Sequence, residues 1–323
     1  MQGPKMRSEA VRENARRLRA KLKLTPLYPF ESRFIETPMG LMHYVDEGQG
    51  DPVLALHGNP SWSFIYRDFI RALAPASRVV APDHIGFGLS EKPGDEVGYS
   101  IDRHIKNLEA LVTTLDLRNI TLVMQDWGGP IGLGMAARHP DRVKALVILN
   151  TFGFYPPAAN MDPDNLVLPA PLRLMRTKGI GDFLVRRLGF FERVAMPTAV
   201  ADGRRWKEVR HAYAGVFESY ADRAGVMAFP RLIPTTTRHP TARLMIEETG
   251  PFLDQFKGPV LGFWGVKDPF FPVEVLDGWR QRLPQAEFTE LASAKHYLQE
   301  DAPDEIVSTV SAALNEWRIE AQS

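Results

Sequence analysis

Asp126 stands where a strand-like segment meets a helix-like one. Residues 120–124 form an apolar run suited to a buried strand, and two glycines after Trp127 lead into a helical pattern. This is the setting of a nucleophile elbow, a tight turn that presents a side chain at a helix amino terminus while glycines let the backbones pack closely. The position holds a carboxylate instead of a serine. Taken alone, an Asp before a helix is more often an N-cap than a nucleophile.

Two further residues follow in the chain order that an elbow nucleophile requires. Asp268 comes just after an apolar, strand-like segment, and His296 lies between the last predicted strand and the closing helix. An acid after a later strand and a histidine in the loop before the last helix complete such a triad. We therefore predict Asp126 as nucleophile, His296 as general base and Asp268 as the acid that orients the imidazole.

The loop HGNPSW (57–62) follows the first short buried strand directly. In such hydrolytic sites this loop supplies one backbone N–H of an oxyanion hole, and the residue after the nucleophile supplies the other. We expect these two donors to be the backbone N–H groups of Asn59 and Trp127.

Alternating strand-like and helical patterns predict the scaffold. The expected strands are an opening hairpin (34–36 and 42–46) and runs at 53–56, 78–81, 120–124, 145–150, 259–264 and 287–291. Helical patterns cover 64–73, 102–115, a segment from about 129, and 303–318. Strand then helix, repeated, predicts an α/β protein with a mostly parallel twisted sheet that helices flank on both faces.

The alternation stops after Asn150. Residues 151–237 contain no strong strand pattern but several helix-like segments rich in large apolar side chains. We read 151–237 as a helical cap inserted into a core formed by 29–150 and 238–323, after a basic helical extension at 1–28.

The extension carries eight Lys and Arg residues and two Glu residues up to Pro26, an excess of six positive charges. Apolar residues spaced by three or four indicate an amphipathic helix that Thr25-Pro26 ends. We favour a helix docked on the body or on a neighbouring subunit; binding to a membrane surface and a transit peptide are the alternatives.

Composition excludes several classes of function. The chain has 323 residues with 39 Lys and Arg against 39 Asp and Glu, so nucleic acid is not an implied partner. It has no cysteine, which excludes disulfides and thiolate nucleophiles and is compatible with the cytoplasmic location that we expect. We find no metal-binding motif and no membrane-length apolar run, and we expect no cofactor.

Five motifs together resemble haloalkane dehalogenases, which have an α/β-hydrolase fold: HGNPSW (57–62), PDHIGFGLSEKP (82–93), QDWGGP (125–130), GVKDPF (265–270) and AKHYLQED (294–301). The resemblance extends from about Phe30 to the carboxyl terminus. It implies that the side chains of Asn59 and Trp127 bind the departing halide. One branch takes its acid from just after the strand before the cap, but 150–157 contain no Glu or Asp, so Asp268 is the expected acid. An Asn-Trp pair with the acid in this later position is most similar to subfamily III and implies a possible homo-oligomer.

The resemblance implies hydrolysis of a small apolar haloalkane to a primary alcohol and a halide ion. Asp126 would form an alkyl ester, and water activated by His296 would hydrolyse it. An epoxide hydrolase is the alternative enzyme; it needs two cap tyrosines, for which Tyr155, Tyr213 and Tyr220 are available. Asn59 argues against it, because that position is usually aromatic in epoxide hydrolases. A non-catalytic ligand-binding protein would often have lost a member of the triad.

Overall fold

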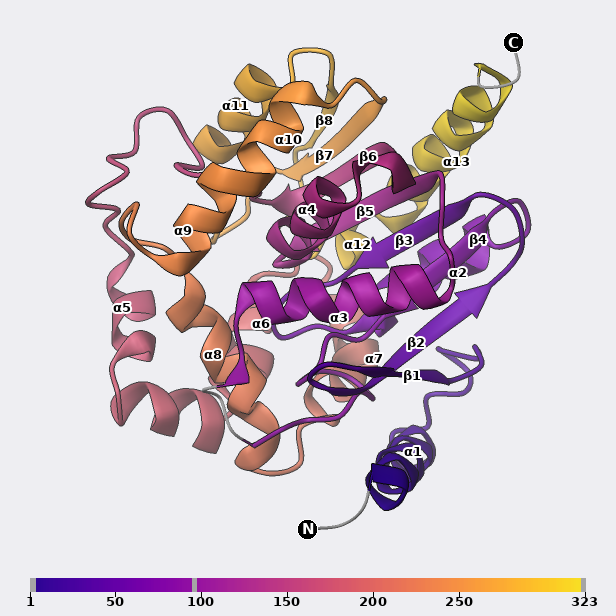
Figure 1. The fold of residues 1–323 in the computed structure, drawn as a ribbon. Coiled ribbons are helices and arrows are strands. Elements are labelled where there is room, and N and C mark those ends of the chain that lie inside the picture. Colours follow the sequence, from indigo (N-terminus) through magenta and orange to yellow (C-terminus); the bar gives the residue numbers. More distant parts are fainter. Residues whose placement is uncertain (1–3, 95–97, 321–323) are drawn as a thin grey trace.

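The computed structural model describes residues 4–94 and 98–320. Eight strands of these residues form one sheet in the order β1-β2-β4-β3-β5-β6-β7-β8 (Figure 1). Strand β2 pairs antiparallel with both β1 and β4, and the remaining neighbours are parallel. The strands are β1 (Arg33–Thr37), β2 (Gly40–Glu47), β3 (Pro52–Leu56), β4 (Arg78–Pro82), β5 (Ile120–Asp126), β6 (Val143–Thr151), β7 (Val260–Gly265) and β8 (Glu287–Leu291). The predicted mostly parallel sheet is confirmed, and β5 runs two residues further than expected, into Asp126.

Helices pack in pairs against this sheet. The pair α3 (Ile101–Thr114) and α4 (Gly128–Arg138) crosses in front of it in Figure 1, and α2 (Arg67–Leu73) packs against α13 (Pro303–Glu320). Helix α11 (Val273–Arg282) also belongs to the core, and a short helix not expected from sequence, α12 (Leu298–Asp301), lies between His296 and α13 in the chain. Every residue of β5 is buried, as expected for a central parallel strand covered on both faces.

Between β6 and β7 the described chain is helical. Its elements are α5 (Ala170–Arg176), η4 (Asp182–Arg187), η5 (Phe191–Ala195), α6 (Met196–Thr198), α7 (Gly203–Ala214), η6 (Ala221–Arg223), α8 (Ala224–Leu232), α9 (Pro240–Leu244), η7 (Met245–Thr249) and α10 (Gly250–Gln255). Of these, η7 and α10 pack against α4 of the core. We keep the name cap for 151–237, whose boundaries stay a prediction.

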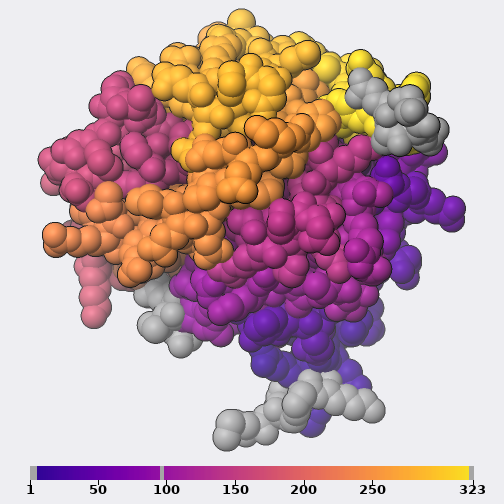
Figure 2. Space-filling model, turned by 45° about the horizontal axis from the view of Figure 1, so that its top comes forward, coloured from indigo at the N-terminus to yellow at the C-terminus, as the bar shows by residue number. Residues whose placement is uncertain are grey.

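The basic amino-terminal segment forms α1 (Pro4–Lys21), which Figure 2 shows in indigo at the lower edge of the molecule. It docks on its own chain, because Leu18 is buried and Lys21 pairs with Glu218 of the cap at 2.6 Å. The helix ends earlier than Thr25-Pro26 predicts, since Lys23 adopts a left-handed backbone conformation with φ of 49°.

Among the residues that the structure describes, no helix is long and apolar enough to cross a membrane. The same residues contain no group of three or more His, Asp or Glu side chains that could hold a metal ion.

Candidate active site

Asp126 occupies a strained position at the carboxyl end of β5. Its backbone φ is 51°, a value that residues other than glycine rarely adopt, and α4 begins two residues later. The turn is tight enough that a Cβ on Gly128 would lie 2.2 Å from the carbonyl oxygen of Leu56, and one on Gly58 would lie 2.1 Å from Oδ1 of Asp126. Gly128 is therefore required by the close approach of the Leu56 backbone, as the elbow predicts, and Gly58 by the close approach of the Asp126 side chain.

The carboxylate of Asp126 lies between backbone donors and an imidazole. Its Oδ1 accepts a hydrogen bond from the backbone N–H of Asn59 at 2.7 Å, and its Oδ2 lies 3.7 Å from Nε2 of His296. Burial raises the pKa of Asp126, while His296 and the backbone N–H groups of Asn59 and Trp127 act in the opposite direction. No side chain caps α4 with a hydrogen bond, so the carboxylate does not serve as the N-cap that sequence alone left open.

His296 is held by Asp268 on its other side. Nδ1 of His296 lies 2.8 Å from Oδ2 of Asp268, and Oδ1 of Asp268 accepts hydrogen bonds from the backbone N–H groups of Phe270 and Phe271 at 2.7 and 3.2 Å. Burial opposes protonation of the imidazole, but the carboxylates of Asp268 and Asp126 outweigh it and raise the pKa of His296. Asp126, His296 and Asp268 thus lie together in the order that a triad requires.

The side chains of Asn59 and Trp127 both contact helix α8. Nδ2 of Asn59 is 3.4 Å from the carbonyl oxygen of Val226, and the Trp127 ring packs edge-on against Phe229 with centroids 5.0 Å apart. Within the described part of the chain, Oδ1 of Asn59 is buried without a partner. The indole N–H of Trp127 likewise has no recorded acceptor there. Among the described residues, the amide N–H of Asn59 is thus only weakly engaged, and the indole N–H of Trp127 is unengaged.

Two side chains of this site were missed by the sequence analysis. Asn150, at the carboxyl end of β6, donates from Nδ2 to Oδ2 of Asp268 at 2.6 Å and accepts from the backbone N–H of Gly265 at 2.7 Å. Gln125 places its amide nitrogen 2.8 Å from Nε2 of His296. A usable signal existed for both, because each is a polar residue ending an apolar strand beside the elbow.

The three tyrosines proposed for an epoxide hydrolase lie elsewhere. The Tyr155 hydroxyl donates to the carbonyl oxygen of Pro163 at 2.7 Å, and the Tyr213 hydroxyl donates to the carboxylate of Glu300. Tyr220 is 44% exposed, with Arg186 over its ring. Two of the three hydroxyls are therefore already engaged, which leaves no pair among them to polarise an epoxide.

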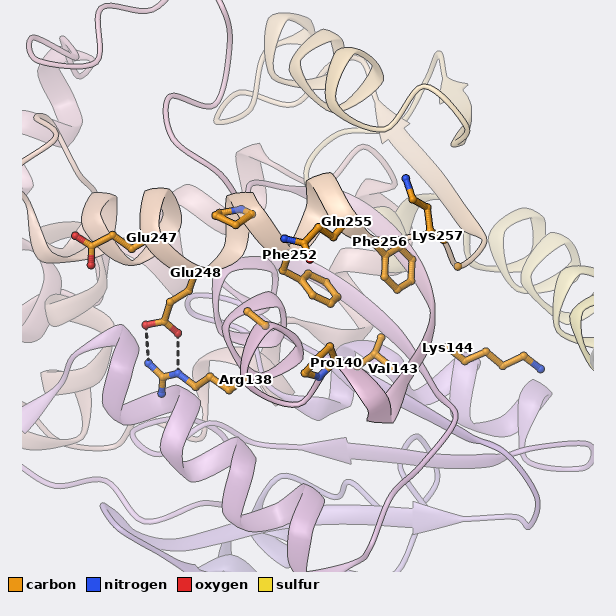
Figure 3. A pocket seen from close by; sticks show the side chains of 13 residues that line it. Arg138, Pro140, Val143, Lys144, Glu247, Glu248, Phe252, Gln255, Phe256 and Lys257 are labelled. Carbon is orange, nitrogen blue, oxygen red and sulfur yellow. Dashed lines mark hydrogen bonds and ion pairs between the residues drawn. The ribbon is translucent and has the colours of Figure 1, made fainter.

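A separate hollow of about 700 Å³ opens on the surface (Figure 3). It lies between α4 and the η7-α10 segment, and its wall includes Phe252, Phe256 and the ion pair between Arg138 and Glu248. None of the predicted site residues lines it, so it is separate from the triad.

Comparison with known proteins supports the fold and identifies the family of the chain. The family model described as alpha/beta hydrolase fold matches residues 51–303. The cis-3-alkyl-4-alkyloxetan-2-one decarboxylase of Shewanella oneidensis is 39% identical over 295 residues, covering 91% of both chains. Haloalkane dehalogenase 2 of Mycobacterium bovis is 40% identical over 285 residues, covering 88% of this chain and 95% of that one.

The crystal structure of haloalkane dehalogenase DbeA from Bradyrhizobium elkani superposes with a TM-score of 0.79 at 26% identity, covering 91% of this chain and 100% of that one. The crystal structure of haloalkane dehalogenase DatA from Agrobacterium tumefaciens superposes with a TM-score of 0.78 at 27% sequence identity, covering 89% of this chain and 97% of that one. The sheet, the elbow and the matched family model define an α/β-hydrolase. Within that fold, the chain belongs to the haloalkane dehalogenase-like family, whose members named here carry out dehalogenation or decarboxylation.

Proposed function

We propose that the protein is an enzyme in which Asp126 displaces an anionic leaving group from a saturated carbon and is left as an alkyl ester. The observation that supports this most directly is the difference in hydrogen bonding between the two carboxylate oxygens of Asp126. Oδ1 is fixed by the Asn59 backbone N–H at 2.7 Å, whereas Oδ2, 3.7 Å from the imidazole, is beyond hydrogen-bonding distance of it. One oxygen is thus anchored and the other is available for attack.

With a haloalkane, the departing halide needs donors that stabilise charge without binding it permanently. The side chains of Asn59 and Trp127 fit this need, because an amide and an indole N–H are neutral. Together with Asp268 as the acid, this pair resembles subfamily III of the haloalkane dehalogenases. Hydrolysis of the ester would then use water activated by His296, with the backbone N–H groups of Asn59 and Trp127 on the oxyanion. The products are a primary alcohol and a halide.

A second substrate class is supported by the relative from Shewanella oneidensis, whose name specifies decarboxylation of a cis-3-alkyl-4-alkyloxetan-2-one. Attack by Asp126 at ring carbon 4 would break the bond from that carbon to the ring oxygen and release a carboxylate onto the same donors. Loss of CO2 from that carboxylate would form the carbon–carbon double bond and expel Asp126 unchanged. Inversion at carbon 4 followed by anti elimination would convert the cis-substituted ring into a cis alkene. This second step consumes no water.

Parallel assays on the same preparation separate these reactions. We expect either halide release and acidification with 1-bromobutane or 1,2-dibromoethane, or CO2 and alkene from a cis-3,4-dialkyloxetan-2-one. Styrene oxide is the third substrate. Asp126→Asn should abolish whichever activity is found, since an amide oxygen is a poor nucleophile. Diol formation from styrene oxide without either other activity would contradict the proposal, as would full activity in Asp126→Asn.

A further inference from the structure

Gln125 is a buried residue whose side chain serves the catalytic histidine. Its Nε2 lies 2.8 Å from Nε2 of His296 and 3.4 Å from the His296 carbonyl oxygen, and these are the hydrogen bonds recorded for the amide. The other amide atom, Oε1, is buried with no partner in the described structure. A buried acceptor without a partner is destabilising, so the contribution of this amide lies in its hydrogen bonds to His296.

The contact with His296 falls on the atom that must accept a proton from water. Nδ1 of the imidazole lies 2.8 Å from Asp268, which makes Nδ1 the N–H donor and leaves Nε2 with the single in-plane lone pair. The Gln125 amide at 2.8 Å is closer to Nε2 than Asp126 Oδ2 is at 3.7 Å. The lone pair of the base is therefore already engaged by an amide N–H, and water can use it only by displacing that amide.

We propose that Gln125 is a positioning residue that controls how the ester on Asp126 breaks down. This inference rests on the proposed function, since it presupposes the ester. By occupying Nε2, the amide slows attack by water and gives an ester that bears a β-carboxylate time to lose CO2, a step that needs no base. An ester formed from a haloalkane has no such route and waits for the amide to move aside.

The direct test is Gln125→Met, which keeps the length of the side chain and removes the hydrogen bond. With 1-bromobutane in pre-steady-state kinetics, one bromide per active site is released in a burst as the ester forms, and the later rate reports ester hydrolysis. We expect the later rate to rise about tenfold, the cost of displacing one buried hydrogen bond, with the burst changed less than about threefold. With a cis-3,4-dialkyloxetan-2-one, the variant should divert product from alkene to the 3-hydroxy acid.

Gln299→Met is the matched control, because Gln299 is also a fully buried glutamine and lies outside the triad. It should change neither the later rate nor the product ratio. Hydrolysis that is unchanged or slower in Gln125→Met would overturn the proposal, because the amide would then be filling space or assisting water. No burst in the wild-type protein, together with no product from the oxetanone, would instead contradict the ester on which the inference rests.

Gln125→Glu keeps the test decisive if the methionine variant does not fold. In the ester Asp126 is uncharged, and the carboxylates of Asp268 and Asp301 are the ones that raise the pKa of His296. An additional carboxylate at Nε2 would favour the imidazolium, so the acid limb of ester hydrolysis should move up by about one pH unit or more. An unmoved limb would show that residue 125 does not act on His296.

Discussion

Nε2 of His296 lies 3.7 Å from Oδ2 of Asp126, while Nδ1 of the same ring lies 2.8 Å from Asp268. The imidazole is therefore hydrogen-bonded to Asp268 and only adjacent to Asp126. This separation suits the proposed carboxylate nucleophile, which needs no proton removed before it attacks, unlike a serine. In the proposed mechanism the base is needed later, when water approaches the ester.

The pH dependence of ester hydrolysis should follow the pKa of His296 in the ester. In the free protein the carboxylates of Asp268 and Asp126 raise that pKa from its ordinary value of 6.5 despite burial. Asp126 carries no charge once it is an ester, and only the neutral imidazole accepts a proton, so the acid limb of the post-burst bromide rate should lie below the pKa of His296 in the free protein, measured by NMR. A limb at or above the free-protein pKa would contradict the charge arrangement described for His296.

Asn150→Leu should slow ester hydrolysis selectively. The variant removes the 2.6 Å hydrogen bond from Asn150 to the Asp268 carboxylate that orients the imidazole. Losing a hydrogen bond to a charged group predicts a decrease of about 10- to 100-fold in the post-burst rate, with the burst preserved. Asn107→Leu is the control, since Asn107 is equally buried but contacts the backbone of Met39. Equal effects of the two variants would mean that the loss is one of general packing.

Asn59→Ala should weaken binding of the leaving ion and keep the oxyanion donor. The substitution removes the side-chain amide but not the backbone N–H that lies 2.7 Å from Asp126 Oδ1. Bromide inhibition measures affinity for the leaving ion. We expect it to weaken by about tenfold, as for one lost hydrogen bond to an anion, with slower carbon–halogen cleavage and ester hydrolysis less affected. Unchanged inhibition by bromide would remove the Asn59 side chain from the ion site.

Glu300→Gln should destabilise the fold without touching the reacting groups. Glu300 is buried and joins three elements, receiving two 2.6 Å hydrogen bonds from Arg67 of α2 and one of 2.7 Å from Arg205 of α7 in the cap. Leaving these guanidinium groups without their carboxylate should cost about 3 kcal/mol in the free energy of unfolding, measured with denaturant. Glu290→Gln, which breaks an exposed pair with Arg280, should cost less than about 1 kcal/mol. Similar losses would show that burial does not set the strength of the Glu300 contacts.

The sequence predicted the sheet well because buried parallel strands are short apolar runs between turn signals. It also predicted which residues lie near one another, since chain order within this fold brings Asp126, Asp268 and His296 to the same end of the sheet. It could not predict the hydrogen bond from Gln125 to Nε2 of His296 or the one from Asn150 to Asp268. Both contacts depend on side-chain directions at strand ends, where the backbone leaves regular geometry, as the φ of 29° at Asn150 shows.

The sequence left open whether the tyrosines of 151–237 serve an epoxide hydrolase. Tyr213 could have been a substrate-facing donor in the predicted cap, but it is fully buried and its hydroxyl donates to Glu300. Only the packing of α7 against the core distinguishes these roles, and it depends on contacts between residues far apart in the chain.

The most direct measurement is mass spectrometry of the His296→Phe variant after reaction with 1-bromobutane. Phenylalanine fills the buried space of the imidazole but accepts no proton, so the ester should form and persist. We predict one bromide released per active site and a butyl adduct on the peptide that contains Asp126, and we predict no adduct in the Asp126→Asn, His296→Phe double variant. Bromide release with no adduct, or an adduct on another residue, would contradict the claim that Asp126 is the nucleophile.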